Sequence, residues 1–358
     1  MNKTSRKWKS FLGILLAAVV LALSGLGRCA SARQNENVGQ LDQAQVGQPG
    51  RRKVELLHVR GNVYMIAGAG ANISVQVGDE VIVVDSGLPQ RSDEILDAIR
   101  SVTDKHILFI IDTSADPDHT GGNAKLSAAG WALPNTARNL LEKQGEVMAP
   151  GASIVAHYNV LERMSLSTGN EPPVPSAVWP TDTYDTRYWR LYNGEGVWIY
   201  HPANAHTDGD SYVIFRSSDV VSTGDIFTLA SYPVIKADQG GSIDGVIAAL
   251  NQIIEFLEPR ASEEGGTYVI PGHGHLCDRH DVVDYRDMVT IIRGRIQYYV
   301  EQGMTLQQVK AAKPTLDYDG LYGATTGPWT SDMFVEAVYR ELSKKKAEER
   351  QKAAGGKQ

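Results

Sequence analysis

The residues best suited to chemistry lie in one short stretch, 112–123, with the sequence Asp-Thr-Ser-Ala-Asp-Pro-Asp-His-Thr-Gly-Gly-Asn. It carries three carboxylates and an imidazole, which are common ligands of divalent metals. In an extended segment Ser114, Asp116 and Asp118 lie on one side, because side chains alternate along a strand, and His119 follows where the chain turns. Alone, the stretch is as consistent with an acidic turn broken by Asp-Pro-Asp as with a metal loop.

Further potential ligands follow apolar, β-type runs elsewhere in the chain, just as the loop at 112 follows the run 106–111. They are His206, Asp225 and His273, which follow the runs 197–200, 220–222 and 267–270. A metal site on a rigid scaffold needs donors that converge from several strand ends. The remaining histidines, His201 and His275 included, are predicted to be hydrogen-bonded or exposed imidazoles without a metal role.

The elements around these residues can be predicted from periodicity. Short β-type runs form a meander that ends at Asp85-Ser-Gly87, and Ser92 is predicted to cap an amphipathic helix. A further helix is predicted to start near Gly121, with its positive end close to Asp118. The tyrosines at 184 and 188 and Trp189 are predicted to pack under a proline-rich loop. The predicted strands are 63–67, 73–77, 81–84, 106–111, 151–157, 197–200, 211–216, 220–222 and 267–270, and the predicted helices are 93–102, 159–165, 282–302, 306–312 and 331–349.

In this order and spacing the motifs resemble the metallo-β-lactamase superfamily over about residues 54–280. The signature of that superfamily is His-x-His-x-Asp-His, followed by a distant His, an Asp and a final His. The resemblance implies an α/β fold, an αββα sandwich of two mixed β-sheets with outer helices, here with additional C-terminal helices. It places the signature on Ser114, Asp116, Asp118 and His119, the distant His on His206, the bridging Asp on Asp225 and the final His on His273. Asp85-Ser-Gly87 also resembles the family's Asp-x-Gly turn.

The sequence departs from this signature where Ser114 and Asp116 replace its first two histidines. The resemblance therefore implies one metal, held by Asp118, His119, Asp225 and His273. A second, weaker site remains open to Asp116, His206 and Asp225. Zinc is favoured, and the added carboxylate makes manganese or iron more competitive.

The resemblance further implies a metal-dependent hydrolase. A metal that lowers the pKa of its water to roughly 7 generates hydroxide, which attacks an ester, lactam, lactone or phosphodiester of a small-molecule substrate. Asp118 is the candidate catalytic residue, either orienting that water or accepting its proton, and the alternative is that Asp118 is purely a ligand. A degenerate member of the fold that binds metal or ligand without turnover is the alternative function. An O2-reducing role like that of the diiron flavoproteins is more remote, because the chain has no flavin domain.

The first 32 residues resemble an export signal, with basic residues, an apolar run at 11–26 and an Ala-Ser-Ala cleavage site. The alternatives are a retained anchor, for which the run is short, and a lipid anchor on Cys29. Cleavage would remove five basic residues and take the formal charge from -7 to -12, which disfavours nucleic acid and anionic membranes as partners. The mature protein, periplasmic or secreted, would keep Cys277 alone and so no internal disulfide. The predicted organisation is 1–32 signal peptide, 33–52 flexible lead-in, 53–280 metallo-β-lactamase-like domain, 281–349 helical extension packed on that domain and 350–358 frayed tail; the oligomeric state is not indicated.

Overall fold

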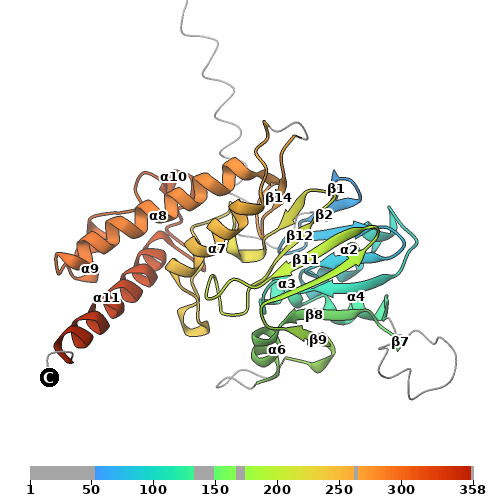
Figure 1. Ribbon diagram of the computed structural model, residues 1–358, viewed down its shortest axis with the longest axis horizontal. Coiled ribbons are helices and arrows are strands. Elements are labelled where there is room, and N and C mark those ends of the chain that lie inside the picture. Colours follow the sequence, from blue (N-terminus) through green and yellow to red (C-terminus); the bar gives the residue numbers. More distant parts are fainter. Residues whose placement is uncertain (1–52, 133–148, 167–173, 262–264, 356–358) are drawn as a thin grey trace, which may run out of the picture. The chain divides into compact units, whose positions relative to one another are not determined.

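A computed structural model describes residues 53–132, 149–166, 174–261 and 265–355 (Figure 1). The predicted signal peptide and lead-in lie outside these residues. Within the described ranges no helix is both long enough and apolar enough to cross a membrane.

Two mixed β-sheets carry the fold. The first has the strand order β1-β2-β3-β4-β5-β8-β9, in which the pairs from β1 to β4 are antiparallel and those from β4 to β9 are parallel. The second has the order β10-β11-β12-β13-β14-β15, in which only β13 and β14 are parallel. The strands are β1 (Glu55–Arg60), β2 (Val63–Ala67), β3 (Ile73–Val77), β4 (Val81–Val84), β5 (Ile107–Ile111), β8 (Ser153–His157), β9 (Asp182–Tyr184), β10 (Arg187–Tyr192), β11 (Glu195–Tyr200), β12 (Tyr212–Phe215), β13 (Val220–Ser222), β14 (Tyr268–Ile270) and β15 (Cys277–Asp278), with a separate pair of β6 (Trp131–Ala132) and β7 (Ala149–Pro150).

Strands β4, β5 and β12 are apolar at every position because both of their faces are buried. In β4, Ile82 and Val84 point into the core between the two sheets, whereas Val81 and Val83 point to the outer face of the first sheet. In β12, alternate residues likewise divide between the inner core and the outer face of the second sheet. This period of two fixes the register, because a slip by one residue would exchange the two faces.

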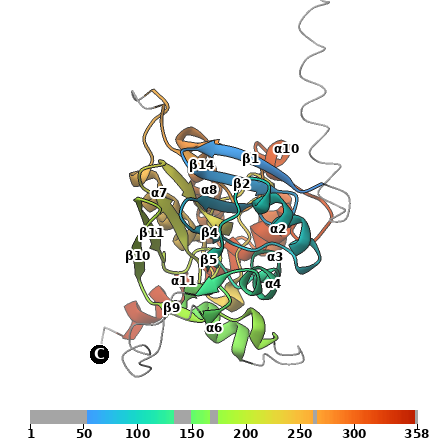
Figure 2. The ribbon, with the colours of Figure 1, turned by 90° about the vertical axis from the view of Figure 1, so that its right-hand side faces the viewer.

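Helices cover the outer face of each sheet. On the first sheet, apolar residues of α2 and α4 join the outer core, and Figure 2 shows these helices beside the strands. On the second sheet, α7, α8, α9 and α11 share one core with the strands, and Figure 1 shows α7, α8 and α11 on the side of the sheets away from α2. The helices are α2 (Ser92–Arg100), α3 (Pro117–Thr120), α4 (Asn123–Ala128), α6 (Tyr158–Ser165), α7 (Ile243–Phe256), α8 (Arg279–Glu301), α9 (Leu306–Ala311), α10 (Asp319–Tyr322) and α11 (Ser331–Gly355). The predicted αββα sandwich with additional C-terminal helices is confirmed.

Several local predictions were wrong. Strand β1 and helix α7 were not predicted, and Ser92 does not cap α2: its hydroxyl donates to the carbonyl of Pro89, in a 3-10 turn, Pro89–Arg91. Trp189 lies on the edge strand β10 and is 62% exposed, so it does not pack under a loop. Helix α11 continues to Gly355, into the predicted tail.

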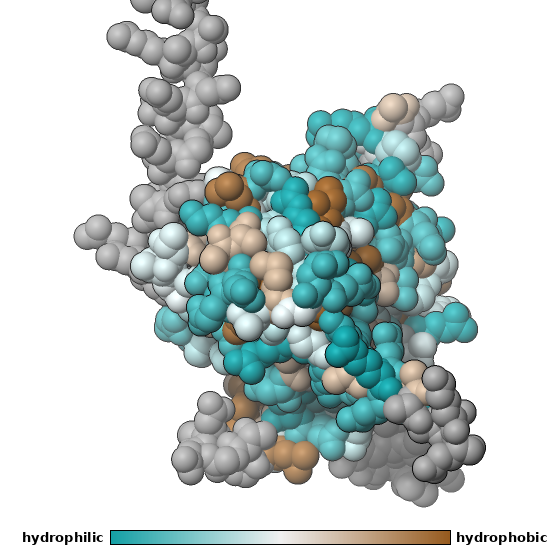
Figure 3. All heavy atoms as spheres, turned by 90° about the vertical axis from the view of Figure 1, so that its left-hand side faces the viewer, coloured by the Kyte–Doolittle hydropathy of each residue, from teal (hydrophilic) through white to brown (hydrophobic). Residues whose placement is uncertain are grey.

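The face of the molecule that carries the ends of α8, α9 and α11 is mainly hydrophilic, with its apolar residues scattered (Figure 3). On the sheet side these helices contribute Phe334, Val338 and other fully buried residues to the core, so their two sides differ sharply. An amphipathic layer of this kind shields the second sheet from water.

Candidate metal centre

The stretch that follows β5 bends at 113–115, and residues 117–120 then form α3, so the predicted strand-like alternation of Ser114, Asp116 and Asp118 was wrong. The helix predicted to start near Gly121 is α4, which begins at Asn123. Pro117 at the first helical position, where its missing N–H costs nothing, explains why a helix starts there. Asp118 and His119 therefore sit on a turn of helix, which directs them to different parts of the site.

Asp118, His119 and His273 form one group, with one potential ligand atom of each residue within 4.8 Å of the others. His273 Nε2 lies 3.3 Å from Asp118 Oδ2 and 3.4 Å from Asp225 Oδ1, and His119 Nε2 lies 3.2 Å from Asp225 Oδ2. His119 is fully buried, whereas the side chains of Asp118 and His273 are each 33% exposed. This half of the centre is thus rigid on one side and open to solvent on the other.

Asp85 fixes the orientation of His119. Its carboxylate accepts a hydrogen bond of 2.8 Å from His119 Nδ1, and the backbone N–H and hydroxyl of Thr113 also donate to it. With Nδ1 as the donor, Nε2 carries the lone pair, and it has no hydrogen-bond partner among the described residues. An imidazole held in this way by a carboxylate is typical of a metal ligand.

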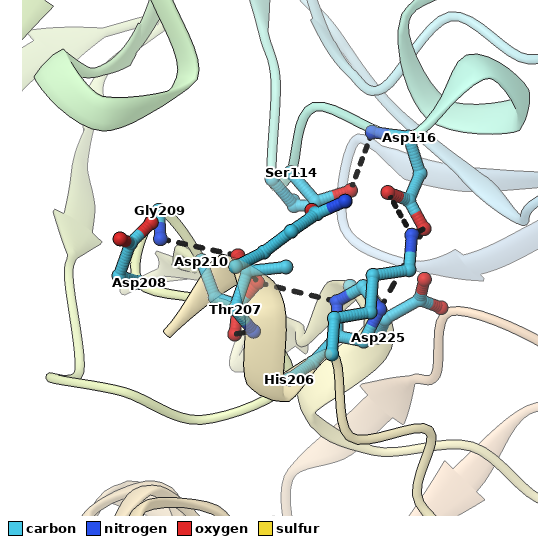
Figure 4. A network of polar contacts seen from close by, with 12 residues as sticks. Ser114, Asp116, His206, Thr207, Asp208, Gly209, Asp210 and Asp225 are labelled. Atoms are coloured by element: carbon cyan, nitrogen blue, oxygen red, sulfur yellow. Dashed lines mark hydrogen bonds and ion pairs between the residues drawn. The ribbon is translucent and has the colours of Figure 1, made fainter. Parts of the chain in front are cut away.

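Asp116, His206 and Asp225 form a second group with the same spacing limit of 4.8 Å. Asp210 orients His206 through a contact of 3.3 Å to Nδ1, and Thr207 donates to Asp210 from both its N–H and its hydroxyl (Figure 4). His206 Nε2 also has no hydrogen-bond partner within the described ranges. It lies 3.6 Å from Asp116 Oδ2.

Asp116 has a second neighbour that the sequence did not indicate. Both of its carboxylate oxygens lie 2.5 Å from Lys236 Nζ. Ser114 is fully buried beside Asp116, and its Oγ accepts from the Asp116 backbone N–H at 3.2 Å (Figure 4). Of the two residues that replace the signature histidines, Ser114 therefore supplies a buried hydroxyl, and Asp116 forms an ion pair with Lys236.

Charges in the centre reinforce one another. Burial alone would raise the pKa of the Asp225 carboxyl, but the charge of His119, whose Nε2 lies 3.2 Å away, outweighs burial and holds the pKa well below its usual range. Burial lowers the pKa of His119, and the charges of Asp225 and Asp85 raise it well above its usual value. The pKa of His206 is also raised, because Asp210 outweighs burial. The ionised carboxylates therefore attract positive charge to the centre, whether it is a proton on an imidazole or a bound cation.

Backbone contacts between the sheets hold the loops in place. The side chain of Asn72, in the β2–β3 loop, donates to the carbonyls of Pro271 and Gly274 on either side of His273. The N–H and hydroxyl of Ser86 both donate to the carbonyl of His119. Gly272 packs so closely that a Cβ there would lie 2.6 Å from Asp225 Oδ1.

The structure thus brings together all six residues predicted as ligands: Asp116, Asp118, His119, His206, Asp225 and His273. His201 and His275 belong to neither group; His201 stacks on His157, and His275 is exposed. Sequence reasoning missed the roles of Asp85 and Asp210 and missed Lys236 altogether. For Asp85, the sequence offered one signal, which is its place in the predicted turn Asp85-Ser-Gly87.

The donor set fits a divalent cation. Two imidazoles and two carboxylates converge in the half formed by Asp118, His119, His273 and the shared Asp225, and Asp85 fixes the tautomer of His119. Mixed nitrogen and oxygen donors suit zinc, and the carboxylates also suit manganese or iron. Asp118, His119, Asp225 and His273 are the residues that would hold the ion.

Two facing mixed sheets, outer helices and paired His and Asp groups at strand ends define the class of metal-binding αββα proteins. A sequence model of the metallo-beta-lactamase superfamily matches residues 60–283, well over half of the chain. The chain belongs to this superfamily, as its motifs predicted. No curated protein matches it.

Solved structures show the same fold. The stereoselective inverting sec-alkylsulfatase Pisa1 from Pseudomonas sp. is 15% identical, with a TM-score of 0.58 over 80% of this chain and 50% of that one. This chain thus spans about half the length of the alkylsulfatase. The DIM-1 metallo-beta-lactamase (15% identity, TM-score 0.47, 67% of this chain and 98% of that one) and a metallo-beta-lactamase from Pontibacter korlensis (13%, 0.47, 66% and 99%) also match.

Proposed function

We propose that the protein is an exported metal-dependent hydrolase whose metal lies between Asp118, His119, Asp225 and His273. One observation carries the proposal: His119 is fully buried, is oriented by Asp85 and directs an unpartnered nitrogen at two carboxylates and a second imidazole. A purely structural histidine would be expected to have a partner on both nitrogens.

A divalent ion held by these residues would act as a Lewis acid and lower the pKa of a bound water. The chain supplies the rest. Asp118 is the carboxylate of this half that is most open to solvent, and burial, which alone would raise its pKa, is outweighed by the hydrogen bond from His273 and the charge of His119. Its pKa is therefore lowered, so at neutral pH it is ionised and able to orient a water or accept its proton.

The substrate class that we propose is a small molecule with an ester-like bond. Among the solved structures with this fold, one is a sec-alkylsulfatase and others are metallo-beta-lactamases. Carboxylic esters, lactones, lactams, phosphodiesters and secondary alkyl sulfates are therefore the panel to test. Zinc is the proposed metal, with manganese and iron as the other candidates.

The experiment measures turnover of this panel by the purified holoprotein, its metal content by elemental analysis, and both again after chelation and metal return. We expect turnover that is lost on chelation and restored by zinc. His119→Ala and His273→Ala should abolish it, since each removes a nitrogen donor. His280→Ala is the matched control, because His280 is exposed and its imidazole lies 3.4 Å from Asp284 on the same helix, α8.

A protein purified without stoichiometric metal would refute the proposal. A protein that binds metal but turns over no member of the panel would instead support the alternative, a binding member of the fold without catalysis. The ion pair at Asp116 is the observation that favours this alternative, because it alters the half of the centre where the signature histidines are missing.

Export is a separate part of the proposal and rests on the sequence of residues 1–32. Fractionation of a bacterial host, with N-terminal sequencing of the mature product, tests it. We expect a periplasmic or secreted chain that begins near Arg33. A full-length chain in the membrane fraction would show that the segment is a retained anchor.

A further inference from the structure

The side chain of Lys236 is held at the centre by the backbone around it. Its backbone N–H donates to the carbonyl of His206 at 3.0 Å, and its own carbonyl accepts from Gly241 at 2.9 Å. A Cβ on Gly241 would lie 2.1 Å from the His206 carbonyl, so only glycine allows the two loops to pack this closely. The loop of Lys236 and the loop of the predicted ligand His206 therefore form one unit.

From this position Lys236 reaches across to the loop that follows β5. Its Nζ lies 2.5 Å from both carboxylate oxygens of Asp116, a residue 120 positions away in the sequence. The side chains are only 28% and 15% exposed, so the pair is shielded from water and from salt. Asp116 in turn shares a ligand group with His206 and Asp225.

An ion in the half formed by Asp116, His206 and Asp225 would have to bind the carboxylate oxygens that Lys236 contacts. It would also lie within a few ångströms of a fixed ammonium group, and like charges at that distance repel strongly in a shielded site. The charge of Asp116 is already balanced by Lys236. Asp118 and Asp225 keep their charges for the other half, where no lysine or arginine is paired with them among the described residues.

We propose that the ammonium group of Lys236 takes the place of a second metal ion in the half formed by Asp116, His206 and Asp225, so that the centre holds one ion beside a cation supplied by the protein. Asp116 then binds Lys236 and is not a metal ligand. The inference rests on the proposed metal centre, but it does not depend on turnover.

The test is a titration with zinc chloride, followed by calorimetry and by elemental analysis after gel filtration. We expect one ion per wild-type chain. Lys236→Met frees Asp116 and should raise the number to two. The double variant Lys236→Met/Asp116→Asn removes the pair without a change in net charge and should bind one ion again. Lys310→Met is the matched control, because it breaks a partly buried pair with Glu336 away from the centre, and it should bind one.

Circular dichroism establishes that each variant is folded, and Lys236→Gln replaces Lys236→Met if the latter is not. Two ions bound by the wild type, or one ion bound by a folded neutral variant at position 236, would overturn the inference. Either result leaves a metal-dependent hydrolase intact. One bound ion without any turnover would count against the hydrolase alone, and a chain that binds no zinc would overturn both.

Discussion

Replacing Asp85 by Asn tests whether the orientation of His119 matters to metal binding. Asp85 is 1% exposed and accepts hydrogen bonds from His119 Nδ1 and from Thr113. Asn has nearly the same shape and keeps one oxygen for the Thr113 N–H. Its amide nitrogen would then face the Nδ1–H of His119, so two donors would meet. The imidazole can escape only by moving its proton to Nε2, the nitrogen that would bind the metal.

The magnitude follows from the part that Asp85 plays. Loss of a carboxylate that orients a metal-bound histidine typically lowers metal affinity about 10- to 100-fold, or about 1.4–2.7 kcal/mol. We expect the upper part of this range, because His119 is fully buried and has no room to rotate. The stability of the fold should change less, since the substitution removes no buried volume.

Competition with a coloured chelator measures the zinc affinity of the wild type and the variant. Asp112→Asn is the control, because Asp112 is equally buried, lies in the loop after β5 that leads to His119, and accepts from Asn123 rather than from a ligand. Burial raises the pKa of Asp112 well above its usual range, so Asn is a close substitute for its neutral form. If the zinc affinity of Asp85→Asn lies within twofold of the affinities of the wild type and of Asp112→Asn, the role given to Asp85 is refuted.

Three further predictions use other contacts. Restoring both histidines with Ser114→His and Asp116→His should leave one bound zinc ion, because Lys236 loses its partner and still repels a second; adding Lys236→Met should raise the count to two by elemental analysis. Gly272→Ala should displace the Asp225 carboxylate and lower zinc affinity roughly tenfold, whereas Gly294→Ala, where a Cβ meets nothing within 4 Å, should not. Burial and the charge of His201 lower the pKa of His157 from 6.5 to about 4, so the neutral form is favoured in the folded chain. Its contribution to stability is complete above pH 6.5 and is lost as the pH falls towards 4, and urea unfolding should show the wild type losing about 2 kcal/mol more than His157→Asn between pH 7 and pH 5.

The sequence predicted those parts of the fold that repeat a simple pattern. Strands β2, β3, β4 and β13 begin and end at the predicted residues, because each is a short β-type run bounded by turn residues. The ligand positions were found for a related reason, since each follows a buried strand. Strand β1 was missed because it is mostly exposed and lacks an apolar run, and the helical turn at 117–120 was missed because Asp-Pro-Asp is also typical of a turn.

The contacts that define the charge of the centre could not be predicted in this way. Asp85 reaches His119 across 34 residues, and Lys236 reaches Asp116 across 120. Neither pair has a local spacing that a motif could record, because each depends on how two loops from different strands meet. From the residue types alone, the carboxylate of Asp116 was predicted to be available as a metal ligand.

The altered signature has a different meaning once these contacts are known. Considered as a motif, the exchange of two histidines for Ser114 and Asp116 removes nitrogen donors and adds a carboxylate, which predicts a weaker site that still attracts a cation. Once Lys236 is taken into account, the same exchange has a second effect: Asp116 supplies a negative charge that balances the ammonium group, which neutral histidines could not do. The loss of the histidines and the presence of the lysine are thus one change in charge distribution. A lysine within reach of the first two signature positions is therefore as informative about metal number as the identity of those positions themselves.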